Sequence, residues 1–144
     1  MTSLLFGFDN EIAEWVRERI DFIGPVDFGP CAAIGVMSDA GELIAGVVYH
    51  DYQPHFSTIQ LSMAAENPMW AKRENLRALL SYPFNQLEVN KAWIATPLRS
   101  ERALRTFYKI GFKKEAVLAD HFGPKNHCVM ARMLAKDFKR LYDG

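Results

Sequence analysis

The chain has 144 residues, which is enough for one compact domain and too few for two of ordinary size. Hydrophobic residues make up 49% and charged residues 24%, and basic and acidic side chains balance at 17 each, which argues against a protein that coats nucleic acid by bulk charge. Because no apolar run is long enough to span a membrane and the N-terminal segment lacks the basic region of a secretory signal, we expect a single cytoplasmic domain over residues 1–144.

The N-terminal third mixes strand-like and helical patterns. Residues 3–8 are apolar and predict a short strand, and Asp9 or Asn10 is expected to cap the helix that follows. Residues 32–37 and 42–50 predict two strands joined by a short Asp/Gly turn, which indicates an antiparallel hairpin. Both runs are apolar throughout, so we expect central strands that are covered on both faces.

The pattern in the middle of the chain predicts a strand–helix–strand unit. Residues 57–66 alternate between apolar and polar side chains, as a strand does when one face lies in the core. A helix from about residue 71 and a buried strand over 91–96 follow. This order implies a parallel strand pair with a right-handed crossover.

The stretch over residues 100–112 has the clearest helix signals. Ser100 is a good N-cap, because its hydroxyl can accept a free N–H of the first turn. Gly111 is expected to end the helix, with Phe112 packing back on the last turn. One apolar stripe is predicted at positions i, i+3 and i+4: Leu104, Phe107 and Tyr108.

Two further strands close the chain. They are expected over residues 112–120 and 127–134, with a turn at 122–126, and the charged tail over 135–144 is expected to be a frayed final turn. The whole order predicts an α/β (α+β) fold: a mixed, mostly antiparallel sheet flanked by about three helices. Nucleophile elbows, Walker loops, dinucleotide fingerprints and zinc motifs are all absent from the sequence, so no metal is expected and periodicity alone indicates no reaction.

The stretch over residues 100–112 resembles the late helix of the GNAT superfamily of N-acetyltransferases, whose motif runs roughly Asn-x-x-Ala-x-x-x-Tyr-x-x-x-Gly-Phe. Ala103, Gly111 and Phe112 match this motif in register. The order and spacing of the later strands and helices are also similar to those of the family, whereas the N-terminal third has one helix where the family usually has two. In its compact length the chain resembles the small transferases carried by phages and prophages.

The resemblance implies a GNAT-like fold with a splayed parallel strand pair and the transfer of an acetyl group from acetyl-CoA to a primary amine. The acceptor would be a small molecule or a peptide of unknown identity, and a homodimer is left open. Three departures from the family matter. Ser100 stands where the family has its asparagine, and its shorter side chain can still hydrogen-bond the pantetheine arm. The loop over residues 68–74 has no glycine to cradle the pyrophosphate, and Phe107 stands where the family usually has its acid tyrosine.

The resemblance also assigns residues to acetyl-CoA. The backbone of the strand that ends near residue 66 would hold the pantetheine arm, and the following loop and the late helix would bind the rest. The expected cofactor contacts are Met63, Ala64, Ala65, Trp70, Lys72, Arg73, Ser100 and Phe107.

Three side chains are candidates for catalysis, and each has a plainer interpretation. Glu66 is a candidate base, or a solvated carboxylate at a strand end. Ser62 is a candidate for orienting water or substrate, or a simple hydroxyl on a sheet face. Tyr108 is a candidate acid for the departing thiolate, or a packed tyrosine with a hydrogen-bonded tip. His50 and His55 flank a proline-containing loop and are candidates for the acceptor site, because histidine titrates in the useful range, or surface histidines without a role.

Two functions from other classes remain as alternatives. The first is a non-catalytic GNAT-like module that binds a ligand or a partner, which the missing loop glycines and the displaced tyrosine motivate. The second is a small transferase that modifies nucleic acid, recruited through a basic set of side chains. That set comprises Arg99, Arg102, Arg105, Lys109, Lys113 and Lys114.

Overall fold

The computed structural model of the protein describes residues 1–20 and 27–142. One sheet carries seven strands: β1 (Ser3–Leu5), β2 (Cys31–Met37), β3 (Leu43–Gln53), β4 (Thr58–Ala65), β5 (Lys91–Pro97), β6 (Lys113–Leu118) and β7 (Cys128–Leu134). The α-helices are α1 (Asp9–Arg19), α2 (Arg73–Ser81), α3 (Glu101–Ile110) and α4 (Ala135–Tyr142). A 3-10 turn, η2 (Pro68–Ala71), precedes α2, and a π-helical turn, η3 (Tyr82–Gln86), follows it. None of these helices is long and apolar enough to cross a membrane.

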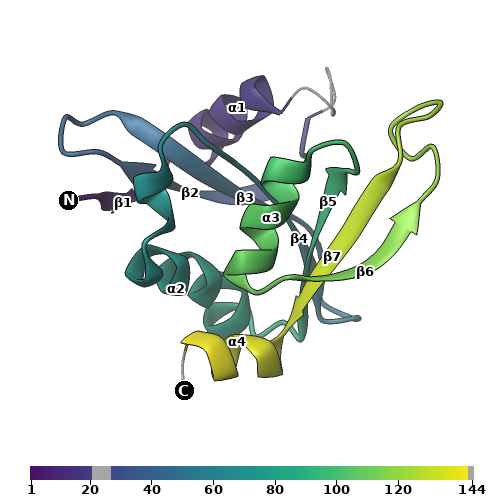
Figure 1. Ribbon diagram of the computed structural model, residues 1–144. Coiled ribbons are helices and arrows are strands. Elements are labelled where there is room, and N and C mark those ends of the chain that lie inside the picture. The colour runs from purple at the N-terminus through teal and green to yellow at the C-terminus, as the bar shows by residue number, and fades with distance from the viewer. Residues whose placement is uncertain (21–26, 143–144) are drawn as a thin grey trace.

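The spatial order of the strands is β1-β2-β3-β4-β5-β7-β6 (Figure 1). Every neighbouring pair is antiparallel except β4 and β5, which are parallel, so the predicted mixed sheet is confirmed. The parallel pairing covers only three residue pairs and ends at Gln60 and Trp93. β4 nevertheless continues to Ala65 and β5 to Pro97, so the two strands splay apart over the rest of their length.

Helix α1 packs closely on one face of the sheet, because two glycines lie beneath it. A Cβ on Gly46 would lie 2.8 Å from Val16 Cγ2 and 3.0 Å from Ile12 Cγ2. A Cβ on Gly35 would lie 3.3 Å from Ile12 Cδ1. The main core, which includes residues of α2, α3 and α4, lies on the opposite face. The expectation that the predicted hairpin is covered on both sides is therefore confirmed.

The two predicted N-caps act differently from what was expected. Asp9 does not cap α1; its Oδ1 accepts a hydrogen bond of 2.9 Å from the Ala33 N–H, at the edge of β2 that the short β1 leaves open. Ser100 does occupy the N-cap position of α3, but its side chain caps no N–H. The prediction of side-chain capping was wrong at both helices.

The apolar stripe of α3 differs by one member from the prediction. Leu104, Phe107 and Ile110 are buried, whereas Tyr108 is 39% exposed, so its place in the stripe was wrong. The predicted stop is confirmed: Gly111 has φ +127°, a conformation that favours glycine, and the Phe112 ring packs edge-on against Phe107.

The tail forms a fourth helix, which corrects both the expected frayed turn and the expected number of about three helices. Phe138 of α4 is 1% exposed and stacks on Phe84 at a centroid distance of 5.1 Å. The Tyr142 hydroxyl donates a hydrogen bond to the Ile110 carbonyl at the end of α3. These contacts make α4 part of the main core rather than a solvated end.

We predict that Phe138→Ala lowers the free energy of unfolding by about 3–5 kcal/mol, because it deletes a buried ring and leaves a cavity. The exposed neighbour Lys139→Ala is the matched control and should change stability by less than about 0.5 kcal/mol. Urea unfolding followed by circular dichroism measures both variants. Equal and small effects would mean that the tail is frayed after all.

Candidate functional site

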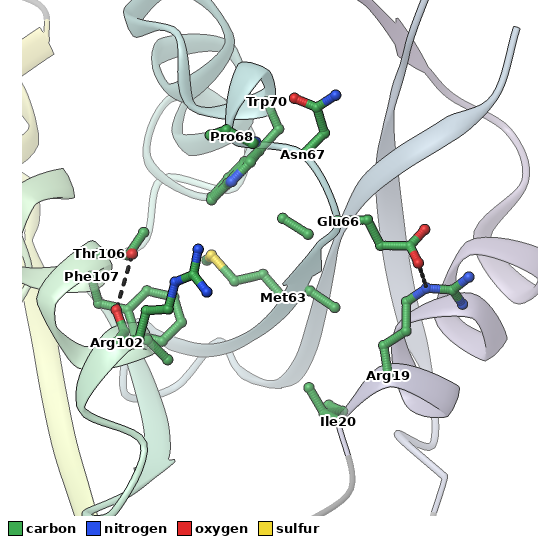
Figure 2. A pocket seen from close by; sticks show the side chains of 13 residues that line it. Arg19, Ile20, Met63, Glu66, Asn67, Pro68, Trp70, Arg102, Thr106 and Phe107 are labelled. Atoms are coloured by element: carbon green, nitrogen blue, oxygen red, sulfur yellow. Dashed lines mark hydrogen bonds and ion pairs between the residues drawn. The ribbon is translucent and has the colours of Figure 1, made fainter.

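The gap between β4 and β5 opens into a cleft of about 580 Å³. Figure 2 shows the cleft, with Met63 of β4 near its centre, Trp70 above it and Phe107 on the wall formed by α3. The lining residues come from α1, β4, the segment that follows β4, and α3: Arg19, Ile20, Met63, Ala64, Ala65, Glu66, Asn67, Pro68, Trp70, Arg102, Ala103, Thr106 and Phe107. A smaller cavity of about 70 Å³ continues into the gap itself, where Ser62, Thr96 and Ser100 supply hydroxyl groups.

The β4 backbone borders the gap without a partner strand. Between Leu61 and Ala65 this strand pairs with β3 on one edge, but not with β5 on the other. Backbone N–H and C=O groups point alternately to the two edges of a strand, so some of them face the gap. They are available to an extended polar chain that lies between the strands, because buried backbone groups require hydrogen-bond partners.

The segment after β4 is ordered without glycine. Asn67 caps the η2 turn, and its Oδ1 accepts a hydrogen bond of 2.9 Å from the Met69 N–H. The Asn75 side chain donates to the Trp70 carbonyl from α2 at 3.2 Å. Trp70 is held 7% exposed over the cleft. A turn capped by Asn67 thus stands where the family that the sequence resembles has a glycine-rich loop.

Two arginines reach the cleft, and they differ in their partners. The Arg19 Nε lies 3.4 Å from Glu66 Oε2, and the two side chains are 32% and 57% exposed (Figure 2). Arg102, on the opposite wall, forms no ion pair with any residue in the described part of the chain. Its backbone carbonyl accepts a hydrogen bond from the Thr106 hydroxyl within α3. The cleft therefore carries one cation that can pair with an anionic ligand.

Five of the eight residues expected to contact the cofactor line the cleft: Met63, Ala64, Ala65, Trp70 and Phe107. Ser100 lines the smaller cavity. The remaining two, Lys72 and Arg73, are not among the lining residues of either. The Arg73 guanidinium donates to the Leu141 carbonyl and lies 5.2 Å from the centre of the Tyr142 ring, so it faces α4. Phosphate binding by Lys72 and Arg73 stays a prediction without a supporting contact.

The three catalytic candidates occupy different places. Glu66 lies in the cleft beside Arg19, and Ser62 lies in the gap. Tyr108 lines neither cavity in the described part of the chain and is exposed on α3, so its proposed role as the acid gains no support from its position.

Ser62 has a partner that the sequence pattern did not join to it. His50 Nε2, on β3, lies 2.8 Å from Ser62 Oγ. Burial lowers the pKa of His50 to about 4, although the carboxylate of Asp51 acts in the opposite direction. The side chain is therefore a neutral imidazole at neutral pH, and the expectation that it titrates in the useful range was wrong.

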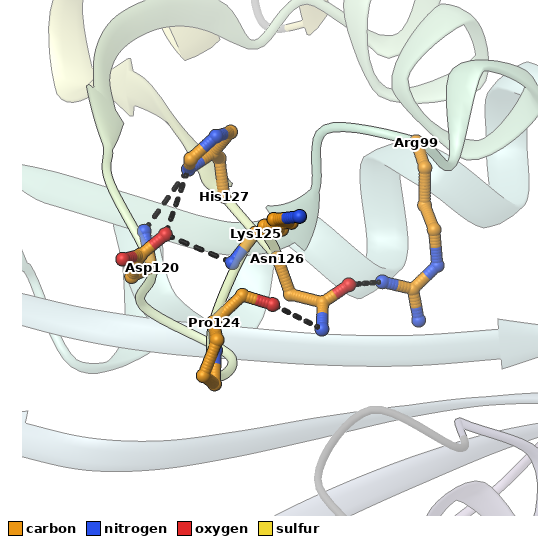
Figure 3. A network of polar contacts seen from close by, with 6 residues as sticks. All are labelled: Arg99, Asp120, Pro124, Lys125, Asn126 and His127. Atoms are coloured by element: carbon orange, nitrogen blue, oxygen red, sulfur yellow. Dashed lines mark hydrogen bonds and ion pairs between the residues drawn. The ribbon is translucent and has the colours of Figure 1, made fainter.

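The turn between β6 and β7 is fixed by a polar network (Figure 3). The Asp120 N–H donates to His127 Nδ1 and the Lys125 N–H to Asp120 Oδ1, each at 3.0 Å. The Arg99 guanidinium donates to Asn126 Oδ1, which ties this turn to the segment between β5 and α3. The predicted turn is confirmed, and Arg99 is engaged within the protein.

Arg19 and Asn67 are among the cleft residues that were not sequence candidates. Asn67 had a readable signal, because an asparagine before a proline, at the end of a strand, is a typical turn and cap residue. Arg19 had none: it reaches the cleft only because α1 crosses β2 and β3 with its C-terminal end toward β4.

The sequence matches no protein-family model, and no curated protein is similar to it in sequence. Solved structures with the same fold do exist. Mutant forms of the spermidine/spermine N-acetyltransferase SpeG from Vibrio cholerae superpose with a TM-score of 0.77 at 13% identity, covering 97% of this chain and 98% of theirs. The dodecameric structure of the spermidine N-acetyltransferase from Vibrio cholerae in an intermediate state superposes with a TM-score of 0.75 at 15% identity. The match covers 99% of this chain and 98% of that one.

A third structure, of the spermidine N-acetyltransferase from Vibrio cholerae in complex with CoA and spermine, gives a TM-score of 0.74 at 13% identity and covers 95% of this chain and 97% of that one. These likenesses extend over nearly the whole of each chain. The GNAT-like fold expected from the late helix and the strand order is therefore confirmed.

The low pKa of His50 predicts a specific pH dependence of stability. The unfolded chain binds a proton at this histidine below about pH 6.5, whereas the folded protein does so only near pH 4, so acidification favours unfolding. Between pH 7 and pH 4.5 the wild type should lose roughly 2–3 kcal/mol more stability than His50→Gln, which cannot titrate. Urea unfolding of both proteins at the two pH values measures this difference. Parallel losses would contradict the buried neutral imidazole.

Proposed function

We propose that this protein is an acetyl-CoA-dependent N-acetyltransferase that acts on a primary amine. The observation that carries the proposal is the short parallel pairing of β4 and β5, which ends at Gln60 and leaves a gap that opens into the cleft of about 580 Å³. The proposal is further supported by the likeness in fold to spermidine N-acetyltransferases, one of which is described in complex with CoA and spermine.

The gap has the properties that a pantetheine arm requires. The arm is an extended chain with two amide groups, and it can pair with β4 backbone groups between Leu61 and Ala65 as a short additional strand. Met63, Trp70 and Phe107 supply apolar walls. The thioester would then lie beside the hydroxyl-lined cavity deeper in the gap, where N–H and O–H donors can polarise its carbonyl.

The phosphates of the cofactor would lie at the open end of the cleft. Arg102 is the cation placed there without an ion-pair partner among the described residues, and the Asn67 cap takes the place of the family's glycine loop. A guanidinium is suited to phosphate, because its N–H groups can donate in parallel to two oxygens.

The acceptor is proposed only as a primary amine, of a small molecule or a peptide. The amine must be neutral to attack the thioester, so its ammonium form has to lose one proton before the attack, and the nitrogen loses a second one during the transfer. Spermine, which one of the similar enzymes binds, is the first acceptor to test. Self-association as a homodimer stays a prediction that size-exclusion chromatography with light scattering can measure.

We expect acetyl-CoA to stabilise the protein and a suitable amine to release CoA thiol from it. At a ligand concentration 100 times its Kd, stabilisation is about 2.7 kcal/mol, which corresponds to a rise in Tm of roughly 5–10 °C. A thermal-shift titration measures binding, and thiol release with a panel that includes spermidine, amino acids and N-terminal peptides measures turnover. The absence of a shift at millimolar acetyl-CoA would overturn the proposal.

We expect Arg102→Ala to raise the Kd for CoA about threefold to tenfold, because a partly solvated charge-assisted contact to phosphate contributes about 1 kcal/mol. Arg105→Ala is the matched control: it is exposed on the same helix and does not line the cleft, so its Kd should be unchanged. Isothermal titration calorimetry measures both. Equal effects would show that any contribution is only general electrostatic attraction.

The thermal shift with acetyl-CoA and the release of CoA thiol together separate this proposal from its alternatives. A non-catalytic module would give a shift with acetyl-CoA and no thiol release. For a nucleic-acid-modifying transferase, two of the six basic side chains already have partners within the protein: Arg99 donates to Asn126 Oδ1, and Lys113 Nζ lies 4.0 Å from Asp137 Oδ1. Salt-dependent retention on DNA would be the observation in favour of that second alternative.

A further inference from the structure

A hydrogen-bonded pair of side chains lies where the two parallel strands separate. Ser62 is two residues beyond Gln60, the last residue of β4 that pairs with β5, and it lines the cavity of about 70 Å³ in the gap. His50, on the neighbouring strand β3, is not a lining residue, but its Nε2 lies 2.8 Å from Ser62 Oγ. The serine therefore connects the gap to a titratable group that stands behind it.

The surroundings of His50 hold the ring in place and keep it neutral. Phe28 packs against it with ring centroids 4.8 Å apart, and its cross-strand neighbours are Cys31 on β2 and Gln60 on β4. Burial lowers the pKa of the imidazole to about 4, and the nearby charge is that of Asp51, which raises it. A neutral imidazole has one ring nitrogen that accepts a hydrogen bond, and Nε2 can be that nitrogen for the Ser62 hydroxyl.

Glu66 and Thr106 are less suited to move a proton at the thioester. Glu66 is at the cleft mouth beside Arg19, and the Thr106 hydroxyl is committed to the Arg102 carbonyl. Among the described residues that line the cleft or the gap, Ser62 is the hydroxyl joined to an imidazole.

We propose that Ser62 and His50 form a proton relay for acetyl transfer, in which the Ser62 hydroxyl touches the attacking amine and His50 receives the proton that Ser62 passes on. This inference rests on the proposed function and assigns two residues to it. Ser62 is the catalytic residue. His50 acts through Ser62 and holds its hydroxyl in position.

The amine nitrogen forms a bond to the acetyl carbon, the carbon–sulfur bond breaks, and the electron pair of that bond leaves with the CoA sulfur. One proton passes from the nitrogen to Ser62 Oγ while the serine's own proton passes to His50 Nε2. Burial disfavours the imidazolium that forms, so His50 holds this proton only briefly. The relay then runs backward and delivers the proton to the CoA thiolate, so the products are the N-acetyl amine and CoA thiol.

The test compares steady-state kinetics of the full-length wild type with those of Ser62→Ala, Ser62→Thr and His50→Gln, using acetyl-CoA and an amine that the wild type accepts. We expect Ser62→Ala and His50→Gln to lower kcat by at least about 100-fold, within the range for general acid–base groups. The KM for acetyl-CoA should stay within about threefold, since both changes leave the apolar walls of the cleft and the unpaired β4 backbone intact. Ser62→Thr keeps the hydroxyl and should retain kcat to within about tenfold.

Glutamine at position 50 decides whether His50 is only structural, because it can still accept the Ser62 hydrogen bond but cannot take up its proton. His55→Gln is the matched control and should behave as the wild type, because His55 is exposed and lines neither the cleft nor the gap. Full kcat in Ser62→Ala or His50→Gln overturns the relay, as does equal loss in Ser62→Thr and Ser62→Ala when both remain folded by circular dichroism. A wild type that releases no thiol with any amine overturns the proposed function as well, and so is distinguishable from failure of the relay alone.

Discussion

The site depends on an interruption in backbone pairing. A parallel pair in the middle of a seven-stranded sheet would normally be hydrogen-bonded along its whole length, but β4 and β5 pair at three positions and then separate. The separation leaves strand-edge groups inside the molecule, which is costly unless a ligand or water satisfies them. The cleft, the hydroxyl-lined cavity and the serine–histidine pair are all located by this one interruption.

The two sides of the gap have different strand partners, although one main core joins them. On one side, β4 belongs to the β1–β4 half of the sheet, onto which α1 is drawn closely by Gly35 and Gly46. On the other side, β5 pairs with β7 along its whole length, and the β6–β7 turn is tied by Arg99 to the segment that leads into α3. Helix α4 packs on the main core through Phe138, which stacks on Phe84 of η3. The two strands are therefore each fixed in the sheet, although they do not pair with each other beyond Gln60 and Trp93.

Much of this arrangement could be predicted from the sequence, because it follows from local pattern. The alternation over residues 57–66 indicated which face of β4 is polar, and Gly111 with Phe112 marked the end of α3. The tail was mispredicted although Phe138, Leu141 and Tyr142 lie at i, i+3 and i+4, because its charges outweighed that stripe. Stacking on Phe84, more than fifty residues away, has no local signal.

The parts of the site that could not be predicted are contacts between elements that are distant in the chain. The direction of Arg73 toward α4 depends on where the tail lies, and the pairing of His50 with Ser62 depends on the register of β3 against β4. The pKa of His50 follows from burial, which composition does not reveal. The residue types were visible in the sequence, whereas their partners required the structure.

We propose that the cofactor binds in the gap between β4 and β5. Amide hydrogen exchange with and without CoA tests it directly, since unpaired strand N–H groups exchange quickly until they find an acceptor. We expect CoA to slow amide hydrogen exchange over the β4 segment from Leu61 to Ala65 and over the first turns of α3, with little change in β1 and β2. Protection elsewhere, or none at saturating CoA, would contradict it.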